Sequence, residues 1–305
     1  EKGSVIVDEA VLETLDYPEA KTLAEYMMLQ KRIAQIESWL DAMKSDGRVH
    51  GRVITNGAVT GRMTHMSPNM AQVPNSGAIY GPECRELWTV EKGNKLVGID
   101  ASGLELRMLA HYMNDDVYTH EVVSGDIHTA NQTAAGLQTR NQAKTFIYAF
   151  LLGAGIGKIK SILKQTTTQA TQAKESFIQA YPGLKLLKET IIPRDAERGY
   201  FIGLDGRFVV CSSENLMLAG YLQNAEACIM KHANILWRDR LDAMGIYYRQ
   251  VNFVHDEWQT ECHPEHAELV AQVQRQAITD TGVALGMRCP LAGSSNIGPN
   301  WMETH

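Results

Sequence analysis

The segment TRNQAKTFIYAFLLGAG, residues 139–155, combines charged, aromatic and apolar residues at helical spacing. Four of its residues recur at every fourth position: Arg140, Lys144, Tyr148 and Leu152. On an α-helix a step of four residues drifts by only about 40°, so these side chains form one stripe along the helix. The remaining positions supply an apolar body that can be buried: Phe146, Ile147, Phe150 and Leu151.

Residues that favour helix ends bound this segment. Thr139 and Gln142 fit the capping box that begins a helix, and Gly153 and Gly155 fit its end. Two cations and an aromatic ring on one stripe suit a site for a phosphorylated base, because cations bind phosphates and a ring can pack against a base. An ordinary amphipathic helix explains the same pattern. The choice between these two interpretations depends on the motifs on either side of the segment.

Composition and charge distribution narrow the possibilities. The chain has 305 residues and a net charge of −6, yet the segment Thr139–Lys188 carries eight Lys or Arg residues and a single acid, Glu175. A basic region on an acidic body suits a protein that handles a polyanion, although a solvated helical face is the simpler alternative. The five cysteines are scattered without a C-x-x-C motif, as is typical of buried, reduced thiols.

The apolar runs and the first residue bear on membrane association and on completeness of the chain. No apolar run is long enough to span a bilayer, and no signal peptide is recognisable, so we expect no association with a membrane. Because the first residue is Glu1 rather than Met, we expect the sequence to be a fragment or a processed product that lacks an N-terminal part.

The N-terminal third predicts a helix followed by loops and a strand. Residues 17–44 repeat apolar side chains at close to 3.6 residues, and we expect this helix to end near Gly47. Residues 51–95 are rich in Gly, Asn, Pro, Ser and Thr, which indicates loops and short strands. Arg62 and Gln72 lie there as long donors that could contact minor-groove acceptors; the alternative is a polar loop over a sheet.

Two carboxylates fall where strands are expected to end. Residues 96–99 form a short apolar strand that Asp100 ends, and a helix is expected from Leu104 to Met113 with Glu105 in its first turn. In residues 246–262, two strand-like runs flank His255-Asp256-Glu257, which predicts a hairpin with acids at its tip. Asp100 and Asp256 could share divalent cations, as in phosphoryl transfer, although an N-cap also explains Asp100.

Further elements follow from local signals. Asp126 is a candidate N-cap with His128 in the first helical turn, where a structural histidine is the common alternative. Residues 156–199 predict helices broken at residues 181–183 and near Pro193. The remaining expectations are a hairpin at residues 200–211 that turns at Asp205-Gly206, and helices at residues 214–241 and 264–285. We expect no zinc site at Cys262, His263 and His266, because no fourth ligand has suitable spacing.

Three motifs together carry a specific resemblance. DASGLELR (100–107), R-x-x-x-K-x-x-x-Y (140–148) and VHDE (254–257) resemble the signature motifs of A-family, Pol I-like DNA polymerases, in the same order. TGRMTHMSPNMAQVP (60–74) resembles that family's entry into the palm. GDIHT, GLDGR and GPNW further resemble the replicative enzymes of short-tailed phages that recruit thioredoxin.

The resemblance implies an α+β fold with a right-hand polymerase palm, in which helices accompany an antiparallel sheet, plus helical fingers and little of the thumb. On this basis residues 1–50 form the base of the thumb, residues 51–113 and 204–305 form the palm, and residues 114–203 form the fingers.

The resemblance also implies roles for individual residues. Two Mg²⁺ ions would be held by Asp100, the Ala101 carbonyl and Asp256, with Glu257 beside them as a further catalytic acid. The triphosphate would contact His128, Arg140 and Lys144, and Lys144 could protonate the leaving pyrophosphate. Tyr148 would pack against the incoming dNTP, with tolerance of dideoxynucleotides, and Glu105 would exclude a ribose 2′-OH. The implied DNA contacts are Arg62, Gln72, Gln223, His255 and Leu152.

Two positions depart from the family pattern, and part of the family's architecture is missing. Leu152 replaces the usual Tyr at the position that stacks on the template, and Ala149 replaces the usual Gly. The resemblance implies an exonuclease domain and a thumb before the palm, so we expect these on another part of the protein or on a companion polypeptide. The thioredoxin-binding insertion belongs to that thumb, which leaves this partner unassigned.

The sequence thus predicts a DNA-directed DNA polymerase that acts with dNTPs on primer-template DNA in phage replication, in the cytoplasm of an infected bacterium. A single-subunit RNA polymerase is one alternative, but Glu105 argues against it because such an enzyme must admit the 2′-OH. A non-catalytic DNA-binding subunit of a split polymerase is another, and the retained Asp100, Asp256, Arg140 and Lys144 argue against that.

Overall fold

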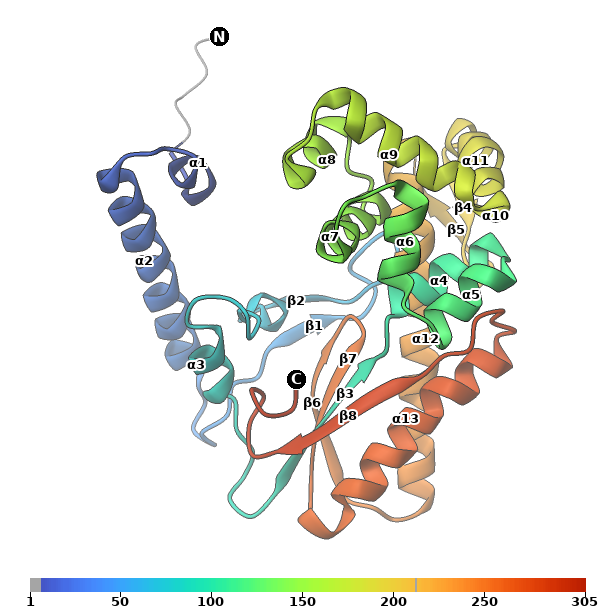
Figure 1. Cartoon of the computed structure of the whole chain (residues 1–305). Helices are drawn as coiled ribbons and strands as arrows, with labels where there is room; N and C mark the ends of the chain where they lie inside the picture. The colour runs from blue at the N-terminus through green and yellow to red at the C-terminus, as the bar shows by residue number, and fades with distance from the viewer. Residues whose placement is uncertain (1–6, 212) are drawn as a thin grey trace. The chain divides into compact units, whose positions relative to one another are not determined.

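The computed structural model describes residues 7–305 except Ser212 (Figure 1). The chain divides into two compact units. The first comprises the chain up to Ile54 together with His65–Trp88, and the second comprises Thr55–Thr64 and Thr89–His305. This division follows chain contacts and does not test the expected thumb, palm and fingers boundaries, which stay predictions.

The first unit is built around one long helix. Its elements are α1 (Glu9–Glu13), α2 (Pro18–Ala42), β1 (Arg52–Ile54), β2 (Thr64–Met66), the 3₁₀ turn η1 (Met70–Gln72) and α3 (Gly81–Glu86). The helix α2 ends five residues before Gly47, because Met43 is extended and Lys44 N–H bonds to the Arg48 carbonyl at 2.9 Å. Strands β1 and β2 pair as a two-stranded sheet. Loops and short strands were expected here and are confirmed, whereas the short helix α3 was not predicted.

The second unit contains an antiparallel sheet of four strands in the order β6 (Tyr248–Val254), β7 (Glu257–Cys262), β3 (Lys95–Ala101) and β8 (Gly293–Gly298). All six residues of β7 are buried. In the register of β3 and β7, Asp100 lies opposite Glu257. The predicted hairpin and the predicted strand are thereby confirmed, except that the strand does not end at Asp100: it continues to Ala101, because both residues pair with β8, a strand that was not foreseen.

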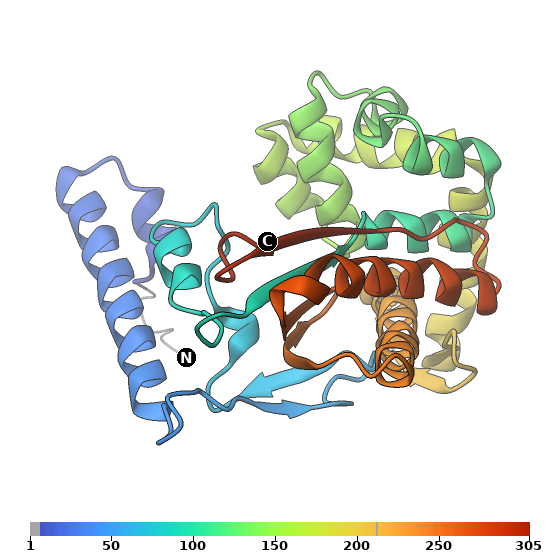
Figure 2. The same cartoon turned by 90° about the horizontal axis from the view of Figure 1, so that it is seen from below.

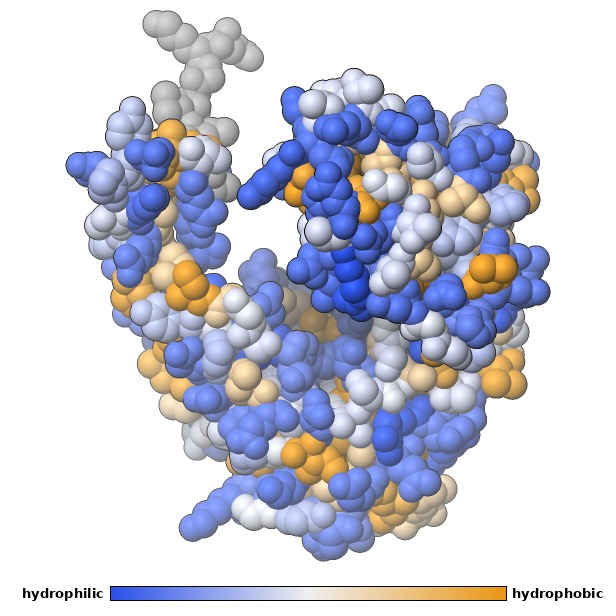
Figure 3. All heavy atoms as spheres, in the orientation of Figure 1, coloured by the Kyte–Doolittle hydropathy of each residue, from blue (hydrophilic) through white to orange (hydrophobic). Residues whose placement is uncertain are grey.

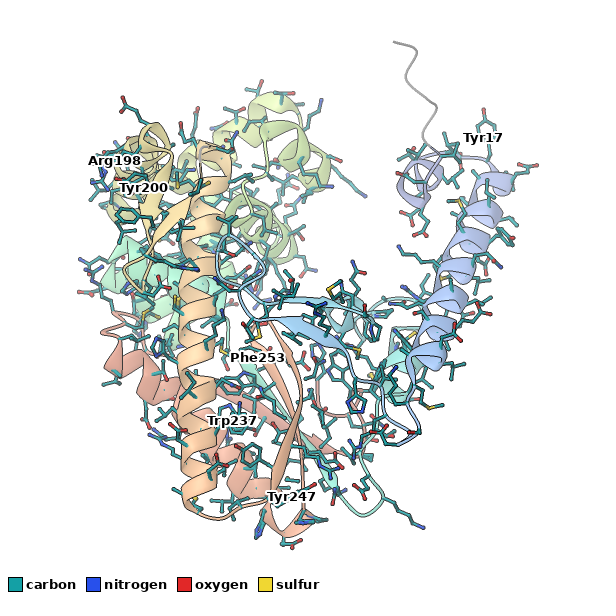
Figure 4. The ribbon with its side chains drawn as sticks, turned by 180° about the vertical axis from the view of Figure 1, so that it is seen from behind. Tyr17, Arg198, Tyr200, Trp237, Tyr247 and Phe253 are labelled. Atoms are coloured by element: carbon teal, nitrogen blue, oxygen red, sulfur yellow. The ribbon has the colours of Figure 1, made fainter. Side chains whose placement is uncertain are left out.

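Two long helices support this sheet. The helix α13 (Ala267–Ala284) packs against β3 and β8, and α12 (Glu214–Ala243) packs against α13, as Figure 2 shows from below. Figure 4 labels Trp237 on α12 and Phe253 on β6. Both rings contact the buried Trp258 of β7, each with 5.9 Å between ring centroids. This aromatic contact fixes the hairpin whose tip carries Asp256.

The C-terminal turn approaches the central strand at Gly98. A Cβ at this position would lie 1.9 Å from the carbonyl oxygen of Thr304, so only glycine allows the approach. Thr304 also donates from its hydroxyl to Gln259 Oε1 on β7 at 2.7 Å. The turn is therefore part of the sheet's packing.

The helical part of the second unit begins directly after β3. Its elements in order are α4 (Leu104–Met113), α5 (Asp116–Val123), α6 (Ile127–Ala135), α7 (Arg140–Leu151), α8 (Ile156–Leu163), α9 (Thr167–Ala180), α10 (Pro182–Leu186), a π-helical turn (Leu187–Ile191), α11 (Ile192–Arg198), and the hairpin strands β4 (Tyr200–Ile202) and β5 (Phe208–Val210). The predicted helices and the hairpin are confirmed. The expected break near Pro193 is wrong: the chain stays helical there, because Pro193 falls in the opening turn of α11 directly after the π-helical turn, where a missing N–H is tolerated.

The helix α7 is held by aromatic packing on its buried face. Phe146 and Phe150 each meet Phe177 of α9 edge to face, with ring centroids 5.6 and 5.2 Å apart. The predicted capping box of Thr139 and Gln142 begins α7, and Gly153, in the left-handed region at φ +78°, follows its end. The opposite stripe of α7 is left to carry the polar side chains.

Candidate active site

The two predicted strand-end carboxylates lie together in the second unit. The backbone N–H of Ala101 donates to the carbonyl oxygen of Asp256 at 3.0 Å, which joins the end of β3 to the β6–β7 turn. His255 precedes Asp256 in the left-handed region at φ +51°. Asp100 keeps solvent exposure, but the surrounding protein displaces part of its hydration, and with the negative charges of Asp256 and Glu257 this raises its pKa to about 6.

The neighbouring acids differ in their surroundings. Burial raises the pKa of Asp256, and the charge of Arg62 only partly opposes this. Glu257 is 6 % exposed, and its Oε1 accepts from Trp301 Nε1 and Gln259 Nε2 while its Oε2 lies 3.0 Å from His305 Nδ1. Burial alone would raise the pKa of Glu257, but the hydrogen bonds and charge of His305, aided by the other donors, lower it. Glu257 therefore fastens the C-terminal turn, and its catalytic role stays a prediction.

Three side chains that can carry positive charge lie at the polar stripe of α7. Arg140 and Lys144 are on α7 itself, and His128 is on α6. Arg140 Nε donates to Asp126 Oδ2 at 2.8 Å, and Asp126 also caps α6 through the backbone N–H groups of His128 and Thr129. The hydrogen bond from Arg140 holds the pKa of Asp126 below its usual range. Burial, together with the charges of Arg140 and Lys144, lowers the pKa of His128. Figure 3 shows many hydrophilic side chains, with pale and hydrophobic ones among them, on the face of α6 and α7 turned to the viewer.

Tyr148 connects this stripe to the carboxylates. Its ring centroid lies 6.3 Å from that of His128. Burial raises the pKa of Tyr148, and the negative charges of Glu105, Asp256 and Asp100 raise it further, so the phenol lies within electrostatic reach of these acids. Glu105 lies in the first turn of α4, and burial raises its pKa as well. The predicted nucleotide site and the predicted metal site are thus contiguous.

Arg62 reaches the same region from a loop that α12 fixes. Asn224 Nδ2 donates to the Thr60 carbonyl at 3.1 Å, and Lys231 Nζ donates to the Gly61 carbonyl at 2.6 Å. Arg62 then donates to the Glu226 carboxylate and lies 4.0 Å from Glu105 Oε1.

The other predicted DNA contacts lie in different places. Gln223 is on α12, one turn before Glu226, and the exposed His255 is in the β6–β7 turn. Leu152 is the C-cap of α7 and is 52 % exposed, one turn after Tyr148. Gln72 belongs to the first unit, where its carbonyl accepts a hydrogen bond from Gln35 Nε2 at 2.9 Å.

The family model described as DNA polymerase family A matches residues 1–303. The chain belongs to this family. It is 38% identical to the DNA-directed DNA polymerases of Escherichia phage T7 and Enterobacteria phage T3, with all of this chain and 49% of each relative covered. It is 28% identical to the thermostable DNA polymerase I of Thermus aquaticus, over 99% of this chain and 38% of the relative. The chain thus spans about half the length of the two phage relatives.

A solved structure shows the same fold. The chain matches the POL domain of Pol1 from M. smegmatis, solved in complex with DNA primer-template and dNTP, with a TM-score of 0.89 and 22% sequence identity. The match covers 100% of this chain and 58% of the other. The expected α+β polymerase fold is therefore confirmed. Among the helices of the described residues, none combines the length and the apolar character that a bilayer crossing requires.

Family A DNA polymerases depend in general on divalent metal ions. The described part of the chain holds no cluster of three or more His, Cys, Asp or Glu side chains arranged as metal ligands. Burial raises the pKa of both Asp100 and Asp256, and the charge of Asp256 adds to the rise at Asp100, while His305 opposes the rise at both carboxyls. Two carboxylates and a backbone carbonyl suit a hard divalent cation that keeps waters and binds substrate phosphates. The residues therefore fit the ions that the family implies.

Sequence reasoning missed the role of Glu226. The sequence placed it on the helix of residues 214–241 without a function, and the structure makes it the partner of Arg62. The available signal was its spacing of three residues from Gln223, which puts both on one helix face. The separation of 164 positions between Arg62 and Glu226 hid the pairing itself.

Proposed function

We propose that this chain carries the nucleotidyl-transfer site of a DNA-directed DNA polymerase, which adds dNMP units to a primer 3′-OH under the direction of a template. The observation that carries the proposal is the convergence within one unit of Asp100 and Asp256 with Tyr148 and the cationic stripe of α7. Family membership and the phage relatives support the same reaction.

In this proposal Asp100, Asp256 and the Ala101 carbonyl hold two Mg²⁺ ions. When bound, the ions activate the 3′-OH and stabilise the charge that develops on the phosphoryl oxygens. The backbone bond from Ala101 to Asp256 keeps the two segments that carry these carboxylates together before substrate arrives. This preorganisation lowers the barrier because the groups need no rearrangement at the moment of reaction.

The helix α7 binds the triphosphate and positions the base. Arg140 and Lys144 contact the phosphates with His128, and Lys144 gives a proton to the leaving pyrophosphate. Arg140 exchanges its bond to Asp126 for a phosphate oxygen, which is easy because both side chains are solvent-exposed and such ion pairs contribute little. The ring of Tyr148 packs against the incoming nucleotide.

Selection of sugar and primer terminus falls to the residues around this centre. Glu105, beside Tyr148, fills the space that a ribose 2′-OH would need, which favours dNTPs over rNTPs. The primer terminus and the minor groove are contacted by Arg62, Gln223 and His255. A further DNA contact comes from Gln72. The template position is occupied by Leu152. We propose that an exonuclease and thumb portion, on the same or a companion polypeptide, completes the enzyme. We propose further that the enzyme serves phage replication in the cytoplasm of an infected bacterium, as its phage relatives suggest.

Primer extension with four templates that differ only in the templating base tests this proposal. The expected result is incorporation of the complementary dNTP on each template in the presence of Mg²⁺, with rNTPs used poorly. Incorporation that ignores the templating base would contradict the proposal. Absence of extension by a folded chain, even after addition of an exonuclease–thumb polypeptide from a relative, would contradict it equally.

A further inference from the structure

The partly buried Arg62 forms an ion pair with the buried Glu226, and among the described residues one oxygen of this carboxylate accepts no hydrogen bond. Glu226 is 4 % exposed, and its Oε2 accepts from Arg62 Nη2. Within the part of the chain that the structure describes, Glu226 Oε1 is buried and has no hydrogen-bond partner, and the same holds for Arg62 Nε. Among the described residues, Arg62 is the only arginine whose guanidinium pairs with this carboxylate.

The pair is a poor device for stability. Burial raises the pKa of Glu226 to about 7, and the charges of Glu105 and Asp256 add to that rise while Arg62 opposes it. A buried ion pair returns little net stability, because desolvation of both charges offsets their attraction. The loop backbone is already held without this pair, since Asn224 and Lys231 bind the carbonyls of residues 60 and 61. What Glu226 adds is the direction of the Arg62 guanidinium.

We propose that Glu226 is a positioning residue that orients Arg62 toward the base pair at the primer terminus and so makes extension sensitive to a mismatch there. The inference rests on the proposed function, which assigns Arg62 to the primer terminus. Glu226 lies one helical turn from Gln223, the other residue given a minor-groove contact, so the orienting carboxylate lies beside both donors.

The chemistry of a guanidinium makes this arrangement effective. A guanidinium has five N–H donors in a rigid plane, so a carboxylate can hold one donor while others remain for a second acceptor. Correct base pairs of either kind present minor-groove acceptors at similar places, whereas a mispair displaces them. An oriented Arg62 meets the acceptor of a correct pair without reorganisation and misses that of a mispair. A freely rotating Arg62 loses this distinction.

Two substitutions at Glu226 test the inference in single-turnover extension from matched and mismatched primer termini. Glu226→Ala removes the partner, whereas Glu226→Gln keeps an acceptor oxygen and the side-chain volume. Arg62→Ala reports the full contribution of the guanidinium, and Asp239→Asn is the matched control because it neutralises an exposed acid of the same helix. Thermal unfolding of each variant verifies that the fold is retained, and Glu226→Gln carries the test if Glu226→Ala does not fold.

The expected loss follows from one charged hydrogen bond. Arg62→Ala lowers the extension rate from a matched terminus about tenfold, since a hydrogen bond of a charged group contributes roughly that factor or more. Glu226→Ala lowers the matched rate by nearly as much and also reduces the ratio of matched to mismatched extension. Glu226→Gln recovers part of the rate and part of the ratio. Asp239→Asn changes neither the rate nor the ratio. The double variant of Arg62 and Glu226 is no worse than Arg62→Ala alone. The loss is in the maximal single-turnover rate, and the dNTP concentration that gives half of this rate is unchanged, because the contact is to the primer and not to the nucleotide.

Different failures separate the inference from the function on which it rests. If Arg62→Ala loses rate while both Glu226 variants keep the wild-type rate and ratio, Glu226 does not position Arg62. A faster matched extension by Glu226→Ala would overturn the inference in the opposite sense, because Glu226 would then restrain Arg62. If Arg62→Ala itself changes nothing although the wild-type chain extends primers, the primer contact assigned to Arg62 fails and the inference fails with it. No template-directed extension by any form contradicts the proposed function.

Discussion

The N–H of Ala101 donates to the carbonyl oxygen of Asp256 at 3.0 Å, so a main-chain bond joins the two strand ends that carry the metal-binding candidates. This bond holds the backbone at the two positions together without using either carboxylate. A substitution of Asp by Asn at either position should keep this geometry and change only the charge.

Asp100→Asn should weaken the pH dependence of stability in metal-free buffer. The pKa of Asp100 rises from 3.8 to about 6 in the folded state, so between these values the folded chain keeps a proton that the unfolded chain has lost. The contribution of Asp100 to the free energy of unfolding is therefore full at low pH and falls as the pH rises through this window. Urea unfolding across the window, with a chelator present, measures this. Identical pH profiles for wild type and variant would contradict the pKa assignment.

Asp126→Asn should release Arg140 without loss of the helix cap, because Asn caps a helix as well as Asp. Since Arg140 bonds to Asp126 in the absence of substrate, its release should leave the KM for dNTP unchanged or lower it. Arg140→Ala should instead raise the KM about tenfold, the effect of one charged hydrogen bond. Steady-state kinetics with dNTP as the varied substrate distinguishes the two. A higher KM for Asp126→Asn would show that the pair itself is required for nucleotide binding.

Glu105→Ala should relax the choice of sugar. If the side chain excludes the 2′-OH by its volume, the preference for dNTP over rNTP should fall by roughly 10–200-fold, the range for a change in pocket size. Glu105→Gln, which keeps the volume, should retain most of the preference. Competing incorporation of dNTP and rNTP opposite one template base measures the ratio. A loss in both variants would mean that charge, and not volume, excludes the ribose.

Trp301→Phe should destabilise the fold more than it slows the reaction. The substitution removes a donor to the buried Glu257 carboxylate and should lower the free energy of unfolding by about 1–3 kcal/mol. Urea denaturation gives this value, and primer extension well below the unfolding transition gives the rate. The complementary variant Glu257→Gln assesses the predicted catalytic role of Glu257: a large loss of rate in a chain of unchanged stability would establish it.

Much of the fold was predictable because its signals are local. The capping box at Thr139 and Gln142 and the left-handed Gly153 mark the ends of α7, and apolar runs mark β3 and the β6–β7 hairpin. The four-residue spacing of the α7 stripe is likewise a property of one helix. The candidate site residues on these elements could therefore be named from the sequence.

The features that were missed depend on contacts between distant segments. Strand β8 is a short, Gly- and Ser-rich segment that becomes a strand only by pairing with β3. The helix continues through Pro193 because a π-helical turn directly precedes it. The pairing of Glu226 with Arg62, and the capture of Glu257 by Trp301, need the folded chain to bring the partners together.

Single-turnover incorporation of one correct dNTP by the wild-type chain and by Asp256→Asn tests the central claim most directly. The account predicts incorporation by the wild-type chain with Mg²⁺ and a loss on the order of 10²–10³-fold or more in the variant, as for removal of a group that stabilises transition-state charge. Thermal stability without metal should be retained, because the Ala101–Asp256 backbone bond does not involve the substituted side chain. A variant that is stably folded and incorporates the nucleotide at the wild-type rate would contradict the assignment of Asp256 to the reaction centre.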